Sequence, residues 1–329
     1  MANRLQLLVN VPPDRANLGI AGVRAVRRLT GDWHLKESDG STEHPGDAWD
    51  TAHETAARDN VFAEPNFEQP WQEDHPGRVA LAARPGDVGK YDDQNPSFPV
   101  GPGFGWHLGD KYTQLAKARA EIEALGNKRS PVRIGIIDVG FDFEHQALPK
   151  APLLRRDLAR NFGDGNPNDA NDPYIEGLFH QNQPGHGTGT LSILAGTKLA
   201  DMLQPEQNGF LLGASPFAEI IPCRIGPAVV LAKTSAFVEA VKYLIAPNAD
   251  PSLRVDVISM SMGGLASEAW ADVVNEAYEA GIVLVTAAGN NFGAPKAIVY
   301  PARFNRVIAA CGVMADGSPY IAGMGTMSG

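Results

Sequence analysis

Residues 134–140 read Ile-Gly-Ile-Ile-Asp-Val-Gly, and residues 185–190, further along the chain, read Gly-His-Gly-Thr-Gly-Thr. The first stretch is a short apolar run ending in a carboxylate and a glycine, which predicts a buried strand that delivers Asp138 to its carboxyl end. The second places the imidazole of His186 at the start of a predicted helix. A carboxylate that holds one imidazole nitrogen frees the other to accept a proton from a hydroxyl. The two stretches therefore predict the base half of a Ser-His-Asp hydrolase.

Two further segments follow along the chain: residues 257–264 read VISMSMGG, and residues 287–290 read AAGN. Together with Asp138 and His186, they resemble the subtilisin-like serine peptidases, from about Trp106 to the end of the chain. The resemblance implies an α/β fold, a parallel sheet sandwiched by helices, in which Asp138 orients His186 and Asn290 donates to the oxyanion. It also implies substrate-binding roles for Ser261, Met262, Gly263, Ala288 and Gly289, and a peptide or protein as the substrate.

The serine motif of that family, Gly-Thr-Ser-Met-Ala followed by Pro, does not occur in these 329 residues. Residues 325–329 (GTMSG) look similar, but they follow Asn290 too closely and leave no sequence for the helix that the nucleophile begins. We therefore expect the serine to lie beyond Gly329, the peptidase domain to be C-terminally incomplete, and the chain by itself to be inactive. Ser328 is the alternative nucleophile within the chain.

Two positions close to the predicted dyad depart from the family pattern. Val139 stands directly after the aspartate, where relatives carry Thr or Ser, and Gly189 stands where relatives commonly repeat a histidine. Neither change removes a proton-transfer group. The sequence thus supports the dyad but leaves the hydrogen bonding around Asp138 open.

The chain divides into three parts. Residues 1–70 predict a small α+β unit, residues 71–105 are rich in Pro and Gly and predict a linker, and residues 106–329 predict the peptidase domain. Residues 61–67 (VFAEPNF) resemble the end of the propeptide of subtilisin-like zymogens. That resemblance implies that residues 1–70 are the protein's own propeptide, covering the cleft near Ser261 and Asn290; an unrelated accessory domain is the alternative.

Apolar periodicity predicts the secondary-structure elements. In the peptidase part, strands alternate with helices, which is typical of a parallel sheet covered on both faces and binding its ligand at the carboxyl ends of the strands. Asp138, Ser261 and Asn290 each follow a predicted strand, so we expect them at one edge. The predicted strands are 5–9, 32–36, 60–64, 132–138, 219–225, 255–260, 282–287 and 307–313; the predicted helices are 15–29, 47–58, 109–125, 186–199, 235–245 and 268–280.

Composition excludes several classes of protein. A net charge of −10 argues against nucleic acid or a membrane surface as a partner, and no apolar run approaches the roughly 18 residues of a membrane span. The amino terminus is too short in its apolar part to be a secretory signal, so the protein is cytoplasmic or its signal has been removed. Cys223 and Cys311 lie in apolar runs and are expected to be reduced core residues.

The sequence leaves two questions open, one about a bound metal ion and one about the function. No organic cofactor is required by the predicted chemistry, and no metal ligand is assigned, although residues 164–172 (DGNPNDAND) have an oxygen density that suits Ca²⁺ as well as metal-free Asx turns. A catalytically inactive, subtilase-like module that binds peptides is the rival function. A nucleotide-binding domain is disfavoured because the chain has neither a Gly-x-Gly-x-x-Gly turn after its first strand nor a Gly-Lys-Ser/Thr loop.

Overall fold

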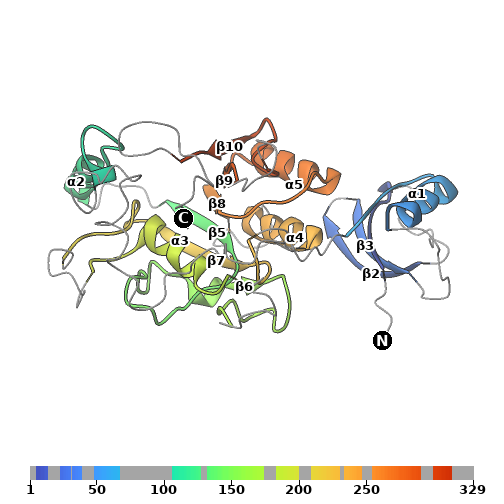
Figure 1. The fold of residues 1–329 in the computed structure, drawn as a ribbon, viewed down its shortest axis with the longest axis horizontal. Coiled ribbons are helices and arrows are strands. Elements are labelled where there is room, and N and C mark those ends of the chain that lie inside the picture. Colours follow the sequence, from blue (N-terminus) through green and yellow to red (C-terminus); the bar gives the residue numbers. More distant parts are fainter. Residues whose placement is uncertain are drawn as a thin grey trace, which may run out of the picture.

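The computed structural model describes residues 5–13, 23–30, 32–38, 48–66, 106–126, 132–173, 183–199, 209–229, 233–246, 254–289 and 299–312. Within them, an N-terminal unit carries a four-stranded sheet in the order β2-β3-β1-β4, and a larger unit carries a six-stranded sheet in the order β10-β9-β8-β5-β7-β6. Figure 1 shows the N-terminal unit, in blue, beside the helices α4 and α5 of the larger unit. The predicted linker, residues 71–105, lies outside the described residues.

The N-terminal unit is an antiparallel sheet covered by one helix. Strand β1 (Gln6–Asn10) lies between β3 (Trp33–Ser38) and β4 (Phe62–Pro65), and α1 (Ala48–Asp59) packs on one face. Leu7 and Val9 point toward α1, whereas Leu8 belongs to the hydrophobic cluster of the larger unit. Because successive side chains of a strand point to opposite faces, β1 contributes to the hydrophobic cores of both units.

One predicted helix of this unit is wrong. Residues 15–29 were expected to be helical, but Val23–Thr30 forms the strand β2, which pairs with β3 in an antiparallel register. The pairing satisfies the backbone groups of β2 from a partner strand, and such tertiary pairing overrides local helix propensity. Residues 14–22 lie outside the described residues.

The larger unit is built on a parallel sheet whose central strand, β5 (Arg133–Asp138), pairs with β7 (Glu219–Arg224) and β8 (Val257–Met260). Strands β9 (Val283–Ala287), β10 (Val307–Ala310) and β6 (Arg160–Asn161) extend the sheet on either side. The parallel α/β sheet that the sequence predicts is therefore confirmed. The two-residue β6 was not predicted, because so short a strand leaves no periodic signal.

Helices cover both faces of this sheet. On one side Ile134 and Ile136 pack with Leu191 of α3 (His186–Ala195), and on the other Ile137 joins a cluster with α4 (Thr234–Ile245) and α5 (Glu268–Glu279). Helix α3 ends at Ala195, earlier than predicted, because Gly196 leaves the helical conformation. Helix α2 (Leu115–Leu125) precedes β5 and ends at Gly126, as predicted, but it begins later than predicted: residues 109–114 form turns between the 3₁₀ helix Trp106–Leu108 and α2.

The described residues also decide two expectations about composition. None of the helices among them is both long and apolar enough to cross a membrane. Both cysteines are free, but only Cys223 is buried; Cys311, just after β10, is exposed, so its expected place in the core is wrong.

Candidate active site

Asp138 and His186 meet at the carboxyl edge of the parallel sheet. Asp138 is the last residue of β5 and His186 the first of α3, and His186 Nδ1 lies 2.8 Å from Asp138 Oδ1. The carboxylate is fully buried, whereas 31% of the imidazole side chain remains exposed. Because Asp138 occupies Nδ1, the neutral ring keeps Nε2 as its proton acceptor. This is the arrangement that a base in a triad requires.

The glycines around these two residues allow the close approach. A Cβ on Gly187 would lie 2.1 Å from the carbonyl oxygen of Gly140, so only glycine lets the first turn of α3 pack against the end of β5. Gly140 has a φ of +129°, a region that side chains disfavour, and it turns the chain away immediately after the aspartate. The motif glycines thus position the carboxylate and the imidazole.

Besides His186, three donors bind the Asp138 carboxylate and its main-chain carbonyl. The Val139 N–H donates to Oδ1 at 2.8 Å, and the Thr190 hydroxyl donates to Oδ2 at 2.9 Å. The main-chain carbonyl accepts from the Ile225 N–H at 3.0 Å. A buried carboxylate is costly unless such bonds replace its water, and the Thr190 donor was not foreseen from the sequence.

A buried arginine lies on the neighbouring strand. Arg224 is opposite Asp138 in the β5–β7 register and only 3% exposed. Its Nε donates to the Val139 carbonyl at 2.8 Å, and its guanidinium is paired with Asp164. Arg224 therefore fixes the chain just after the aspartate while its own charge is neutralised by Asp164.

The electrostatic environment favours a protonated imidazole. Burial lowers the pKa of His186, but the hydrogen bond to Asp138 and the negative charge of Asp138 raise it, and the net pKa lies above the ordinary 6.5. The Asp138 field therefore stabilises the imidazolium that a base forms when it takes a proton.

The predicted substrate-binding residues lie near the same edge, but their side chains differ in exposure. Ser261 follows β8 directly and is half-buried, and Gly289 is exposed. Met262, in contrast, is 2% exposed and belongs to the hydrophobic core. Its side chain therefore packs inward, away from solvent.

Residues 299–300 join the two segments that carry the predicted substrate-binding residues, 261–264 and 287–289. Gly264 and Tyr300 exchange both backbone hydrogen bonds, at 2.8 and 3.1 Å, and the Val299 N–H donates to the Ala288 carbonyl at 3.1 Å. The Gly263 N–H donates to the Val229 carbonyl at 3.0 Å. The Gly263 N–H is thus already paired within the chain.

Two predicted residues lie outside the described part of the chain. Asn290, the expected oxyanion donor, follows immediately after Gly289, the last described residue of its segment, and Ser328 lies beyond residue 312. The structure thus describes the base half of the predicted site and part of its substrate-binding segments.

The oxygen-rich loop 164–172 uses its carboxylates as hydrogen-bond acceptors. Asp164 binds Arg224, Asp169 Oδ1 accepts the N–H of Asn171 at 3.0 Å, and Asp172 Oδ2 accepts the N–H of Gly185 at 2.5 Å. No group of three or more His, Cys, Asp or Glu side chains arranged for a metal occurs among the described residues. Through these bonds the loop anchors the start of α3, by way of Asp172, and the end of β7, by way of Arg224.

The N-terminal unit caps the helices of the larger unit. Glu64 accepts hydrogen bonds from the Ser267 hydroxyl at 2.7 Å and from the Glu268 and Ala269 N–H groups at 3.1 and 3.2 Å. Asn66 Oδ1 likewise accepts the Ser235 N–H, at 3.0 Å, in the first turn of α4. These are amides that a helix leaves without an internal partner. Because α4 and α5 follow parallel strands, their first turns lie at the same edge of the sheet as Asp138.

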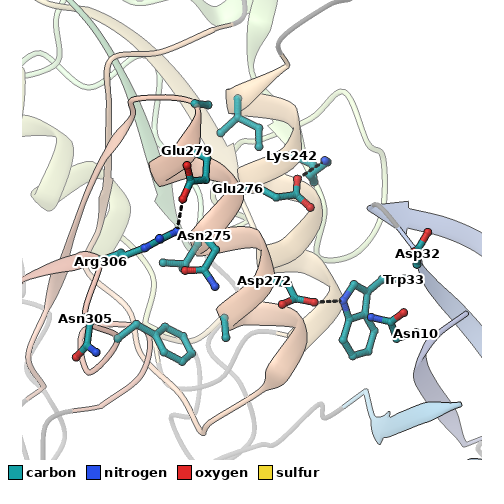
Figure 2. A pocket seen from close by; sticks show the side chains of 15 residues that line it. Asn10, Asp32, Trp33, Lys242, Asp272, Asn275, Glu276, Glu279, Asn305 and Arg306 are labelled. Atoms are coloured by element: carbon teal, nitrogen blue, oxygen red, sulfur yellow. Dashed lines mark hydrogen bonds and ion pairs between the residues drawn. The ribbon is translucent and has the colours of Figure 1, made fainter. Parts of the chain in front are cut away.

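A tryptophan completes the contact between the units. Trp33 is 2% exposed, packs edge-on against Phe62, and donates its Nε1–H to Asp272 of α5 at 2.8 Å. Figure 2 shows this bond at a cavity of about 920 Å³ that both units line. In the same view, Lys242 pairs with Glu276 and Arg306 with Glu279. None of the predicted site residues that the structure describes lines this cavity.

Comparison with known proteins places the chain in a family. The profile of the subtilase family, peptidase S8, matches residues 129–322, and the chain belongs to that family. It is 27% identical over 213 residues to subtilisin amylosacchariticus of Bacillus subtilis subsp. amylosacchariticus, covering 62% of this chain and 48% of that protein. It is 29% identical over 192 residues to subtilisin DY of Bacillus licheniformis, covering 57% and 59% of the two chains. The chain thus spans about half the length of the curated relatives it matches.

A solved structure shows the same fold at low sequence identity. The epidermin leader peptide processing serine protease of Staphylococcus aureus superposes with a TM-score of 0.58 at 14% identity, covering 97% of this chain and 71% of that one.

Proposed function

We propose that this protein is a serine endopeptidase in which Asp138 and His186 form the base half of an Asp-His-Ser triad. The proposal rests chiefly on the 2.8 Å contact between Asp138 Oδ1 and His186 Nδ1, at the sheet edge of a chain that belongs to the subtilase family. Membership of that family favours a peptide or protein as the substrate. The relatives are named subtilisins, which supports the same class of reaction.

The mechanism uses amino-acid side chains alone. A serine hydroxyl, which we place outside residues 1–329, attacks the scissile carbonyl while its proton passes to His186 Nε2. Asp138 holds the ring by Nδ1 and stabilises the imidazolium, which then returns the proton to the leaving amine. We assign Asn290 to the oxyanion, where one such donor contributes about 3 kcal/mol to transition-state stabilisation.

We assign the binding of the substrate backbone to Ser261, Gly263, Ala288 and Gly289. Glycine offers an extended peptide an unobstructed backbone for strand addition. The Gly263–Val229 hydrogen bond implies that the segment around Val229 moves aside when the peptide pairs with Gly263. Met262 then supports this segment from the core and does not contact the substrate.

We propose that residues 1–70 act as a propeptide that assists the folding of the larger unit. Support comes from Glu64 and Asn66, whose side-chain oxygens accept hydrogen bonds from backbone N–H groups in the first turns of α5 and α4. These turns lie at the edge of the sheet that carries Asp138. An accessory domain that remains attached is the alternative, and it predicts that residues 1–70 are never cleaved from the active enzyme.

Labelling with a fluorophosphonate tests the proposed function. A longer form of the protein with a Gly-Thr-Ser motif downstream of Gly329 should be labelled and should cleave a peptide, and both properties should be lost in His186→Ala. The 329-residue chain should remain unlabelled. Label on Ser328 would place the nucleophile inside the chain. A folded longer form that binds peptides but is neither labelled nor active would establish the inactive binding module instead.

A further inference from the structure

The Asp138 carboxylate has two oxygens with different partners. Oδ1 faces His186 Nδ1 and the Val139 N–H, both at 2.8 Å, whereas Oδ2 faces the hydroxyl of Thr190 at 2.9 Å. Thr190 lies one helical turn after His186 on α3, so both side chains point from the same helix face toward the end of β5. One helix therefore supplies the imidazole to one carboxylate oxygen and a hydroxyl to the other.

The position of the hydroxyl proton follows from its two possible acceptors. Thr190 Oγ1 also lies 3.1 Å from the Gly187 carbonyl, but a hydroxyl carries a single proton. If that proton pointed to Gly187, two oxygen lone pairs would face each other across 2.9 Å at a fully buried anion. The shorter, charge-assisted bond to Oδ2 is therefore the one that forms.

We propose that Thr190 is a positioning residue, whose hydroxyl holds the Asp138 carboxylate in the orientation in which it binds His186. The catalytic consequence rests on the proposed peptidase function, but the positioning itself does not. Val139, the residue directly after Asp138, has no side-chain donor, so its contribution to the carboxylate is its backbone N–H. With one oxygen already shared between His186 and Val139, the Thr190 bond restrains rotation of the carboxylate about its Cβ–Cγ bond.

A matched set of variants separates positioning from helix stability. Thr190→Val removes the hydroxyl and keeps the shape, and Thr190→Ser keeps the hydroxyl. Ser192→Ala is the control, because Ser192 lies on the same helix and its hydroxyl donates to the Gly189 carbonyl at 2.7 Å, away from the dyad. Two charged groups near the dyad are unchanged in all three variants: Arg224 of β7, which is paired with Asp164, and Asp172, which accepts the N–H of Gly185.

The first measurement is NMR on the 329-residue chain, which needs no nucleophile. The His186 ring is assigned by comparison with His186→Ala, and its pKa and the low-field proton of the Nδ1–Asp138 bond are followed. In Thr190→Val we expect the pKa to fall toward 6.5, because the bond to Asp138 that raises it is loosened, and the low-field signal to broaden or disappear. Thr190→Ser and Ser192→Ala should match the parent chain.

The second measurement is activity, in a form of the protein that carries its serine. Thr190→Val should lower kcat by about 10-fold to 100-fold, the range for loss of a hydrogen bond to a charged group, with little change in KM. An unchanged His186 pKa and low-field signal in Thr190→Val would overturn the proposal. A rise in the pKa would also overturn it, because it would mean that Thr190 only screens the charge. A loosened dyad in a protein that proves inactive would leave the positioning intact and refute the peptidase function.

Discussion

Two buried carboxylates, Asp138 and Glu64, are held in much the same way but serve different regions of the molecule. Asp138 is fully buried and Glu64 is 4% exposed, and each accepts a side-chain hydroxyl and at least one backbone N–H. Asp138 has, in addition, a titratable partner in His186, whereas the donors that bind Glu64 are neutral. A buried carboxylate can thus take part in proton transfer when its partner is a titratable group such as His186. When its partners are backbone N–H groups and a hydroxyl, it acts as a helix cap.

Removing the titratable partner has the largest expected effect. In a form that carries its nucleophile, His186→Ala should lower kcat on the order of 10⁶-fold, because a triad loses nearly all of its function when its base is removed. Glu64→Ala in the same form should leave kcat within about 10-fold of the parent, since Glu64 binds no reacting group. Similar losses of kcat in the two variants would contradict the distinction between them.

The close packing of α3 against the end of β5 should be disrupted by a single added methyl group. Gly187→Ala should destabilise the chain by about 3 kcal/mol, because its Cβ would lie 2.1 Å from the Gly140 carbonyl oxygen and the backbone must shift. Gly189→Ala is the matched control, with no atom within 4 Å of its Cβ, and should be neutral or stabilising by up to about 1 kcal/mol. Urea unfolding and the His186 NMR signal measure both effects. Equal changes in stability for the two variants would show that the contact with the Gly140 carbonyl does not limit the packing of α3 on β5.

The contact between the units depends on Glu64. Glu64→Ala should lower the free energy of unfolding by about 2 kcal/mol, because the first amides of α5 lose a buried acceptor. It should also speed proteolysis of the N-terminal unit. Glu54→Ala on the exposed side of α1 is the control and should change stability by less than about 0.5 kcal/mol. Equal stability of the Glu64 variant and the control would mean that Glu64 does not hold the units together.

The pH dependence of stability gives the smallest effect and separates the two carboxylate sites. The folded pKa of His186 lies above 6.5, so its contribution is fully present below pH 6.5 and is lost as the pH rises through the folded value. Burial raises the pKa of Glu64 above 4.5, although its hydrogen bonds to Ser267, Glu268 and Ala269 lower it. The contribution of Glu64 to the free energy of unfolding is therefore also lost as the pH rises, but from pH 4.5 upward. Free energies of unfolding of the parent, His186→Ala and Glu64→Gln, measured from pH 4 to 9, should separate the pH ranges in which His186 and Glu64 contribute to stability. A His186 contribution that grows with rising pH would contradict the geometry.

Activity should follow the same titration with the opposite consequence. The base must be neutral, so kcat/KM in an active form should rise with pH as His186 loses its proton, along a limb that lies above pH 6.5. A limb at or below pH 6.5 would mean that Asp138 does not stabilise the imidazolium. The measurement is a pH–rate profile with a peptide substrate.

The prediction from sequence succeeded where the signal is local. Apolar runs before Asp138 and after Arg254 predicted β5 and β8, and the alternation with helices predicted the parallel sheet. The prediction failed at Val23–Thr30, where the partner strand β3 decides the conformation, and it did not foresee the burial of the Met262 side chain in a core assembled from distant elements. In both cases, the deciding contact comes from outside the segment itself: from the neighbouring strand β3 for Val23–Thr30, and from elements distant in the chain for Met262.

By itself, the sequence determined the class of fold, the glycines around His186, and the two residues that meet at the end of β5. Only the tertiary structure decided which donors complete the buried carboxylates: Thr190 at Asp138, and Ser267 with the first amides of α5 at Glu64. The physical reason is that the periodicity of strands and helices is a property of neighbouring residues. The hydrogen bonds of a buried carboxylate, in contrast, depend on donors that folding brings within about 3 Å. Hydroxyls such as Thr190 carry no sequence signal for that role until the acceptor lies beside them.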